Sequence, residues 1–382
     1  MAIALKHWRE SASLIIASKK MAMKQPNPSL LEKLMKTQPE HIENKNEEFL
    51  RLLLLKRKPT NSFMPSMYVF PGGTSHKSDF SREWLDLIGC KNNNLLDLFT
   101  RGKIGSPIFS TIREPPFCDV PSEIALRITA IRETFEESGI LLGRPMTDLP
   151  DLPLSSMSAH PICSTYCNLP SQVSLEWRKQ VISDSSNFIL MCKELKMVPD
   201  IWSLYEWSNW LTPLLQKARF DTAFFLCCVD EAPLILDSNE TEDGAWLSPS
   251  GTLKACLEKI VALAPPQLYE LSRLLHFKTT DDLLSFTWGR SSHRVNRWMP
   301  VIYQCQDGLI FALPGDDLYP ANPDLTGEIT NGPLEKTESV AELRSLYPRQ
   351  HCIVVYKNKQ LSLYCNIKPN QYHILPREFN KI

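Results

Sequence analysis

The order of apolar and polar residues along the chain predicts a succession of strands and helices. Four short apolar runs have the length and composition of buried strands, at 13–18, 49–55, 67–70 and 223–229. The run at 223–229 is apolar almost without interruption, which is typical of a strand that is covered on both faces. The polar stretch at 26–45, between the first two runs, is predicted to be a loop.

A long helix is predicted to end at Gly139, with Ser122 as the residue that caps its start. Its apolar residues follow one another at spacings of four, three and four, which places them on one face: Ile124, Ile128, Ile131 and Phe135. We expect this apolar face to pack against the strands.

The same reading of the pattern continues to the end of the chain. Further helices are predicted at 81–88, at 171–195 with Leu175 in the core, and after the pairs Ser248-Pro249 and Pro265-Pro266. Further strands are predicted at 207–211, 352–356 and 360–365, of which the last two form a hairpin. This mixture of elements indicates the α/β fold class.

Composition and charge exclude several classes of protein. The chain has 382 residues, 43% of them hydrophobic and 22% charged, as in a globular protein with a sizeable core. The net charge of −1 predicts no nucleic-acid and no membrane partner, and no apolar run is long enough to span a bilayer. The eleven cysteines include no Cys-x-x-Cys pair, so we expect reduced thiols in an intracellular protein.

Three carboxylates stand out on the predicted long helix. Glu133, Glu136 and Glu137 are spaced i, i+3 and i+4, so they share one helix face. Their mutual repulsion is unfavourable unless a cation is bound, and oxygen ligands suit a hard ion such as Mg²⁺. A bound Mg²⁺ would suit the attack of water on a phosphate. From the spacing alone, the alternative is a solvated acidic face without chemistry.

The residues around these carboxylates resemble a known family motif. Residues 132–140, Arg-Glu-Thr-Phe-Glu-Glu-Ser-Gly-Ile, are similar to the second half of the Nudix box, Gly-x5-Glu-x7-Arg-Glu-U-x-Glu-Glu-x-Gly-U, in which U is a bulky apolar residue. Thr134 occupies the first U. Counting back, the first half would fall on Cys118 and Ile124, which do not match it, so we expect the first glutamate of the box to be missing.

A second resemblance lies upstream, where Phe70-Pro71-Gly72-Gly73 is similar to the turn that opens the box. The box is therefore expected to be split by an insertion at 74–120, which resembles the motif 19 branch of the Nudix family. Better-known members of that branch are coenzyme A and acyl-coenzyme A diphosphatases. The insertion either shapes the substrate pocket or is an ornament without a role in the chemistry.

The resemblance implies a fold and a metal site. The fold would be a Nudix α/β/α sandwich at 1–278, with a C-terminal extension at 279–382 packed on it. Metal ligands in the family correspond to Glu133 and Glu137, and Glu136 to a third ligand or a residue that positions water. Arg132 corresponds to the arginine that orients the carboxylates, and the cofactor would be Mg²⁺ or Mn²⁺.

Substrate-binding residues are predicted at two places. The first is the opening turn, with Phe70, Gly72 and Gly73. The second is a basic cluster in which Arg294 and Arg297, with Arg290 and His293 close by, would bind a further phosphate such as the 3′-phosphate of coenzyme A. A plain surface cluster is the alternative.

Two further acids, Glu240 and Glu242, are candidates for an extra metal ligand or a general base, with a solvated loop as the favoured alternative. Nudix enzymes differ in where the base lies, so the sequence leaves its identity open.

The function implied by the resemblance is hydrolysis of the diphosphate bond of coenzyme A or acyl-coenzyme A. The alternatives are an ADP-ribose or nucleotide-sugar diphosphatase, and a catalytically silent Nudix module that only binds. A small-molecule substrate is the expected partner, and the choice between monomer and homodimer stays open. The family suggests a peroxisomal location, although the last three residues, Asn380-Lys381-Ile382, only loosely resemble Ser-Lys-Leu, so the cytoplasm and mitochondrion remain alternatives.

Overall fold

The computed structural model describes residues 8–18, 50–61, 63–89, 106–148, 161–213, 218–230, 234, 241–291, 293–325, 332–368 and 373–378. The predicted loop at 26–45, Glu240 and the final triplet Asn380-Lys381-Ile382 lie outside these ranges.

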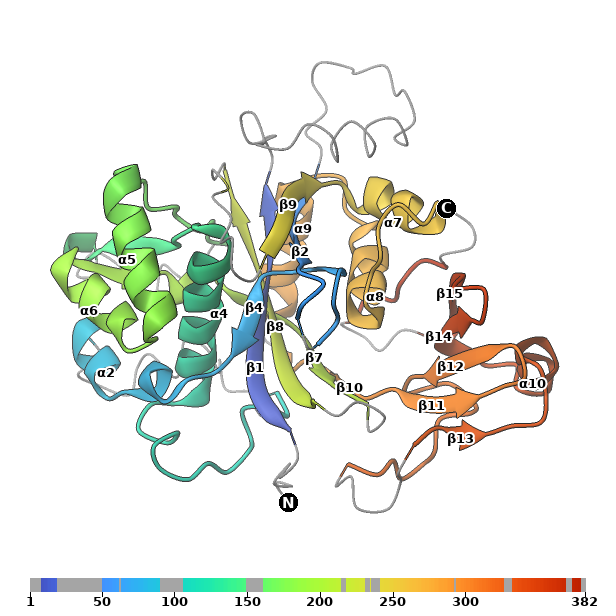
Figure 1. Ribbon diagram of the computed structural model, residues 1–382. Coiled ribbons are helices and arrows are strands. Elements are labelled where there is room, and N and C mark those ends of the chain that lie inside the picture. Colours follow the sequence, from blue (N-terminus) through green and yellow to red (C-terminus); the bar gives the residue numbers. More distant parts are fainter. Residues whose placement is uncertain are drawn as a thin grey trace.

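An eight-stranded mixed sheet forms the centre of the molecule (Figure 1). Its strands are β1 (Arg9–Ser18), β2 (Arg51–Arg57), β3 (Tyr68–Val69), β4 (Gly72–Thr74), β7 (Tyr205–Leu211), β8 (Phe220–Val229), β9 (Thr241–Leu247) and β10 (Arg297–Trp298). The order is β10-β7-β8-β1-β2-β3, with β4 on β1 and β9 on β2. β1 pairs with β8 in parallel along its whole length, so the predicted strands at 13–18 and 223–229 are neighbours at the centre.

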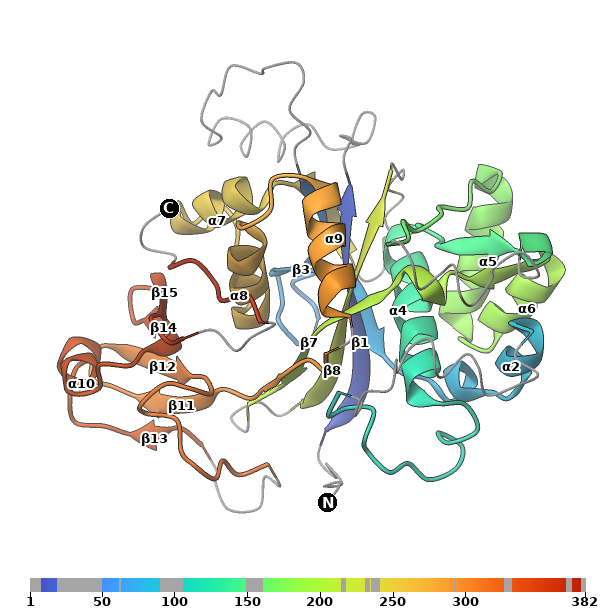
Figure 2. The same ribbon diagram turned by 180° about the vertical axis from the view of Figure 1, so that it is seen from behind.

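Helices cover both faces of this sheet, as Figures 1 and 2 show from opposite sides. On one face lie α2 (Glu83–Leu87), α4 (Ser122–Ser138), α5 (Ser171–Ser183) and α6 (Asn187–Glu194), with the 3₁₀ turn η1 (Lys77–Phe80). On the other face lie α7 (Pro249–Leu257), α8 (Pro265–Leu274) and α9 (Thr280–Arg290). Alternate side chains of β1 lie on opposite faces of the sheet. Leu14 and Ile16 belong to the core with α4, and Ile15 belongs to the core with α8. The predicted α/β/α sandwich is confirmed.

The predicted helix at 122–138 is present as α4, and its apolar stripe is fully buried. Gly139 ends it in the left-handed conformation, with φ of 73°, as predicted. The prediction that Ser122 caps its start was wrong. Pro121 occupies the cap position, and no side chain bonds to the first turn.

The helix predicted at 171–195 is in fact two helices. α5 ends where Asp184 takes an extended conformation, and α6 begins at Asn187. Leu175, predicted to be in the core, is 39% exposed because α5 lies at the edge of the molecule. A small separate sheet, β5 (Gly143–Pro145) with β6 (Met197–Pro199), and the turns η2 (Met146–Asp148) and η3 (Ile201–Ser203) flank this region.

The C-terminal extension forms a second, five-stranded sheet in the order β13-β11-β12-β14-β15. Its elements are β11 (Val301–Gln304), β12 (Gly308–Ala312), β13 (Leu334–Glu335), α10 (Val340–Leu346), β14 (His351–Tyr356) and β15 (Leu361–Cys365). The last two strands are the predicted hairpin. The residues just before this sheet belong to the main body, because α9 packs against β8 and β10 pairs with β7.

None of the helices in the described ranges is long and apolar enough to cross a membrane.

Candidate active site

The acidic face of α4 lies against the glycine turn at the start of β4. The backbone N–H of Gly72 donates a hydrogen bond of 2.9 Å to Glu137 Oε2. A Cβ atom on Gly73 would lie 2.3 Å from Glu133 Oε2, so only glycine fits beside this carboxylate in its present position. Gly72 has φ of +151°, and a Cβ there would meet the backbone of Ala12 at 2.3 Å. The structure thus brings together the two halves of the predicted site.

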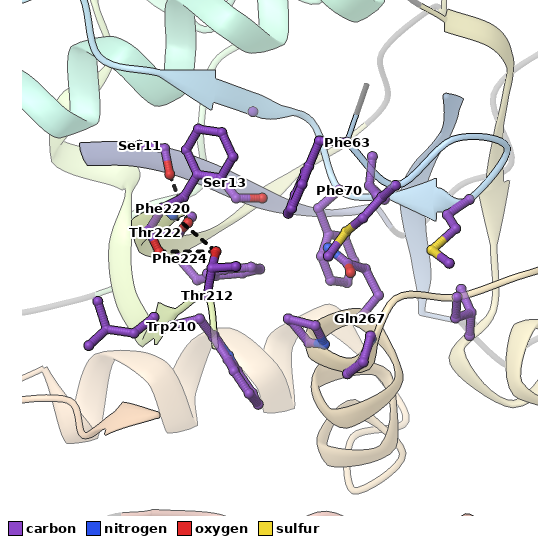
Figure 3. Close-up of a pocket in the computed structure, with 18 of the residues that line it drawn as sticks. Ser11, Ser13, Phe63, Phe70, Trp210, Thr212, Phe220, Thr222, Phe224 and Gln267 are labelled. Atoms are coloured by element: carbon purple, nitrogen blue, oxygen red, sulfur yellow. Dashed lines mark hydrogen bonds between the residues drawn. The ribbon is translucent and has the colours of Figure 1, made fainter. Parts of the chain in front are cut away.

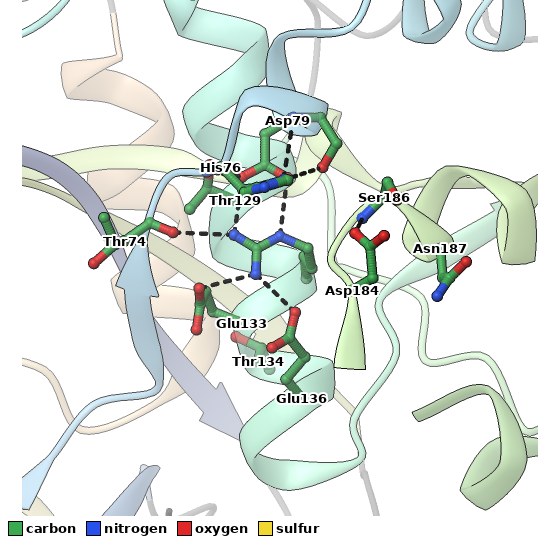
Figure 4. Close-up of polar contacts among 12 residues, drawn as sticks. Thr74, His76, Asp79, Thr129, Glu133, Thr134, Glu136, Asp184, Ser186 and Asn187 are labelled. Atoms are coloured by element: carbon green, nitrogen blue, oxygen red, sulfur yellow. Dashed lines mark hydrogen bonds and ion pairs between the residues drawn. The ribbon is translucent and has the colours of Figure 1, made fainter. Parts of the chain in front are cut away.

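Arg132 is the centre of the site's polar contacts and is only 1% exposed. Its Nη1 donates to Glu133 Oε1 at 2.9 Å and to Glu136 Oε1 at 2.7 Å. Its Nη2 donates to the carbonyl oxygen of Thr74 at 3.1 Å (Figure 4). One guanidinium therefore fixes two carboxylates and the strand opposite them, which is the orienting contact expected from the family motif.

Asp79 is a site residue that the sequence analysis missed. Both of its oxygens accept hydrogen bonds of 2.9 Å from Arg132, one from Nε and one from Nη2. Thr129 Oγ1 and the backbone N–H of His76 also donate to it, at 2.8 and 2.9 Å. Asp79 is 1% exposed, so this is a buried ion pair with its hydrogen bonds satisfied.

The position of Asp79 corrects the expectation about the first half of the Nudix box. That half does not fall near Cys118 and Ile124, which would require an unbroken box. It is present as Gly73-x5-Asp79, with the spacing of Gly-x5-Glu and an aspartate in place of the glutamate. Counting six positions forward from Gly73 would have found it. The chain between Phe80 and Ser122 then separates the two halves.

Burial and charge act together on the ionisation of this cluster. Burial alone would lower the pKa of Arg132, but the neighbouring Asp79 and Glu133 outweigh it and hold this pKa above its ordinary value. Burial and the charge of Glu133 raise the pKa of Glu136 to about 7, although Arg132 opposes the shift. A bound divalent cation would relieve this repulsion between carboxylates.

A cavity of about 500 Å³ opens beside the glycine turn. Gly72 and Gly73 line it together with Phe70, so the three substrate-binding residues predicted at the opening turn share one wall. Aromatic side chains supply much of the remaining surface (Figure 3): Phe63, Trp210, Phe220, Phe224 and Phe311. Among the described residues that line it, Arg57 is the one that carries a charge. It donates from Nε to the carbonyl oxygen of Phe63 at 3.1 Å.

The predicted insertion contributes to the cavity through its first residue. Thr74 lines the cavity, whereas none of the described residues between 75 and 120 does so. Several of them, including Phe80, Trp84 and Ile108, are buried in the core on the α4 side of the sheet. The described part of the insertion therefore packs in the core beside α4, on the side of the sheet that carries Arg132.

The predicted basic cluster does not form one exposed phosphate site. Arg297 is bound to Asp221 at 2.8 Å and to Asn209 at 2.9 Å. Arg290 is buried against Trp207, and burial together with the nearby Arg273 lowers its pKa to about 9.

Two other predicted residues lie away from the cavity lining. Arg294 is exposed at the surface, and neither it nor Arg297 lines the cavity. Glu242 forms a surface ion pair of 2.9 Å with Lys56 and does not line it either. The sequence could not show that Asp221, far from Arg297 in the chain, would become its partner.

The donor chemistry of the α4 face fits a divalent cation. Within the described ranges, no three acidic, histidine or cysteine side chains already converge as a compact metal-binding group. Mg²⁺ does not require such a group, since it takes one or two carboxylates and completes its shell with water and substrate phosphates. Glu133 and Glu136 reach the same nitrogen of Arg132, so carboxylate oxygens already lie close together. Glu133 lies against Gly73, which lines the cavity, although neither carboxylate lines it.

Comparison with known proteins gives matches over nearly the whole chain. The family model of the NUDT19 Nudix domain matches residues 8–274, and that of the NUDT19 C-terminal domain matches residues 302–366. The protein named acyl-coenzyme A diphosphatase NUDT19 from Xenopus laevis is 39% identical, covering 97% of this chain and 96% of that protein. Its counterparts in Gallus gallus and Homo sapiens are 38% and 34% identical, covering 98% and 97% of this chain and 96% and 95% of those proteins.

Proposed function

The chain belongs to the NUDT19 family of Nudix hydrolases, and from this membership we propose that it hydrolyses the diphosphate bond of coenzyme A or acyl-coenzyme A. The products would be 3′,5′-ADP and 4′-phosphopantetheine or its acyl form. Water forms a new bond to one phosphorus, and the bridging P–O bond breaks. The observation that carries the proposal is the Arg132 network, which holds two carboxylates beside a cavity large enough for part of such a substrate.

Divalent metal is a general requirement of Nudix hydrolases, and we propose Mg²⁺ or Mn²⁺ held by Glu133, Glu136 and Glu137. When bound, the cation would polarise a phosphoryl oxygen and make a water molecule more acidic. The chain's own contribution is to hold the ligands in place before substrate arrives. Arg132 fixes Glu133 and Glu136, and the N–H of Gly72 fixes Glu137.

The glycine turn gives the diphosphate close access to these carboxylates. Gly72 and Gly73 line the cavity and Glu133 lies against Gly73, so a diphosphate bound at this turn would lie near the carboxylates of α4. The single charged residue in the described lining, Arg57, is placed to meet a negatively charged part of the substrate. A silent binding module would not need two carboxylates as close together as Glu133 and Glu136, where burial and the charge of Glu133 raise the pKa of Glu136.

A substrate panel tests the proposal. The purified chain is incubated with Mg²⁺ or Mn²⁺ and coenzyme A, acetyl-coenzyme A, ADP-ribose, NADH or UDP-glucose, and products are separated by chromatography. We expect the two coenzyme A compounds to be cleaved with the highest kcat/KM. Preference for ADP-ribose or UDP-glucose would favour the nucleotide-sugar alternative, and no turnover of any compound would favour a silent module.

Glu133→Gln and Glu137→Gln test the metal site in the same assay. Each change keeps the shape of the side chain but removes the charge, so we expect hydrolysis to fall by at least about a hundredfold. Glu83→Gln is a matched control, because Glu83 is an exposed acid that pairs with Lys193 at the surface. Near-normal turnover in both site variants would contradict the assignment of these ligands.

A further inference from the structure

One wall of the cavity comes from the C-terminal sheet, to which the predicted extension belongs. Phe311 of β12, Val355 of β14 and Leu361 of β15 line it. Val355 and Leu361 are direct neighbours across the β14–β15 ladder. The cavity is thus enclosed by both family domains, although the glycine turn and the carboxylates belong to the Nudix part.

The face of the C-terminal sheet that carries these residues is otherwise buried against the main body. Ile353 and Leu363, on the same face, are 0% exposed and share a core with α8. The opposite face packs against α10 through Ile310 and Val354. Val355 and Leu361, however, are only partly buried, and both line the cavity. Apolar side chains that line a cavity are typical of a site for an apolar ligand group.

The opposing part of the lining contains a polar group without a partner. Gln267, at the start of α8, is 6% exposed, and its Oε1 has no hydrogen-bond partner within the described structure. Figure 3 shows Gln267 facing the cavity, across from Ser13 and Phe63. A buried acceptor of this kind is satisfied when a ligand N–H donates to it.

From these observations, and resting on the proposed function, we infer that the cavity binds the acylated pantetheine arm of the substrate. Gln267 accepts a hydrogen bond from an amide N–H of that arm, and Val355, Leu361 and Phe311 contact the acyl chain. The C-terminal sheet is therefore the part of the enzyme that distinguishes long acyl groups from short ones.

The chemistry of the lining favours this half of the substrate over the phosphorylated adenosine. A 3′-phosphate placed against the C-terminal wall would be a poorly solvated dianion among apolar side chains. A pantetheine arm has two amides and a hydroxyl to satisfy but carries no charge, and the hydrocarbon part of an acyl chain needs no hydrogen bonds. Each methylene that becomes buried would raise kcat/KM by about threefold to fourfold until the wall is covered.

The test compares free coenzyme A with hexanoyl- and lauroyl-coenzyme A in Val355→Phe and in a control, Leu309→Phe. Leu309 lies opposite Val355 on the same sheet face but does not line the cavity. We expect Val355→Phe to lower kcat/KM for lauroyl-coenzyme A at least tenfold more than kcat/KM for free coenzyme A. The control Leu309→Phe should show no such difference between the two substrates. Leu361→Ala enlarges the cavity at this wall, so it should shift the preference toward longer acyl chains.

Equal losses on all three substrates in Val355→Phe, or no loss on any, would overturn the inference. The inference about the acyl chain and the proposed function can fail separately. Coenzyme A hydrolysis itself is contradicted if the unchanged protein cleaves none of the three substrates. Gln267→Met provides a second readout by product inhibition. We expect inhibition by 4′-phosphopantetheine to weaken roughly tenfold and that by 3′,5′-ADP to stay constant. The reverse result would place the adenosine half in the cavity.

Discussion

At the scale of single residues, Gly73 shows how closely the turn and the acidic face fit. We predict that Gly73→Ala lowers kcat by at least about tenfold, because the new Cβ would displace Glu133 from its present position. Gly289→Ala is the matched control. Nothing lies within 4 Å of a Cβ there, and alanine favours the helix by about 1 kcal/mol, so activity should hold and stability should rise slightly.

The measurement for this pair is kcat together with the free energy of urea unfolding. Retention of full kcat in Gly73→Ala would mean that Glu133 can move without cost to the reaction. Such a result would argue against a rigidly held ligand.

Asp79 provides a second prediction at this scale. Asp79→Ala leaves Arg132 buried without its bidentate partner, and removal of one partner of a buried pair costs about 3–5 kcal/mol of stability. Activity should fall as well, because Arg132 would no longer be fixed behind Glu133 and Glu136. The exposed pair of Glu83 and Lys193 is the control, since Glu83→Ala should change stability by about 0.5 kcal/mol or less.

Urea unfolding and turnover of coenzyme A, measured on the same preparations, check the prediction for Asp79. A variant that keeps wild-type stability would show that Glu133 and Glu136 alone can hold Arg132.

The residues of the site were predictable to different degrees. The spacing of Glu133, Glu136 and Glu137 placed them on one face, because a helix repeats locally and needs no knowledge of the fold. Asp79 keeps the spacing of the motif from Gly73, but counting back from Arg132 missed it because the two halves are far apart in the chain and meet only through tertiary packing. Arg297 was assigned to substrate because its partner Asp221 lies in β8, which β7 separates from β10, so the two side chains come together only in the folded sheet.

At the scale of elements, strands and helices with strong patterns were predicted well and their limits less well. β8 was predicted from its unbroken apolar run, which only a doubly covered strand requires. The break between α5 and α6 was missed although residues 183–187 are all polar and the backbone at Asp184 is extended. Local periodicity does not reveal how two short helices pack against α4.

Helix α8 contains a buried ion pair, and the arginine of this pair also binds the C-terminal tail. Arg273 donates to Glu270 at 2.7 Å and to the carbonyl oxygen of Ile374 at 2.9 Å, and both charged side chains are fully buried. Glu270 also accepts from the indole N–H groups of Trp207 and Trp210. We predict that Arg273→Met costs about 3–5 kcal/mol, because it leaves Glu270 charged and without its cation.

A double-mutant cycle with Glu270→Gln measures this coupling. We expect the double variant to be more stable than Arg273→Met alone, since the uncompensated charge is gone. Additive losses in the cycle would mean that the two side chains stabilise the fold independently.

At the scale of the whole molecule, the two sheets are joined by one continuous core. Side chains of the C-terminal sheet, such as Phe311 and Ile353, belong to the same apolar cluster as α8 and Phe70 of the opening turn. The sequence predicted an extension packed on the Nudix domain, but it could not indicate that this extension would complete a cavity. That property depends on which face of β14 is turned inward, and periodicity alone does not orient a sheet.

The junction between the sheets contains a buried histidine that should make the fold sensitive to acid. His351 is 0% exposed, with Nδ1 at 2.8 Å from the carbonyl oxygen of Pro314 and Nε2 at 2.9 Å from the hydroxyl of Tyr269. A carbonyl only accepts, so Nδ1 carries the hydrogen and Nε2 accepts from the tyrosine. Burial lowers the pKa of His351 from 6.5 to about 4, although Pro314 and Asp316 oppose the shift.

The sign of the effect follows from proton binding. Between pH 6.5 and about 4 the unfolded chain binds a proton at this position and the folded chain does not, so stability falls as the pH is lowered through this window. For one such group the loss at pH 5 is about 2 kcal/mol relative to pH 7.5. His373 is partly buried, and its lowered pKa acts in the same direction.

We therefore predict that His351→Gln reduces the difference in unfolding free energy between pH 7.5 and pH 5 by about 2 kcal/mol. Glutamine does not titrate and keeps an amide that can donate to Pro314, so the variant removes the proton linkage rather than the docking contact. Urea titrations of both proteins at the two pH values measure it, with fluorescence as the readout because Trp298 packs against His351. An equal difference in both proteins would place the acid-sensitive group elsewhere in the fold. If His373→Gln reduces the difference in unfolding free energy between the two pH values as much as His351→Gln does, the two histidines titrate as one unit at the junction of the sheets.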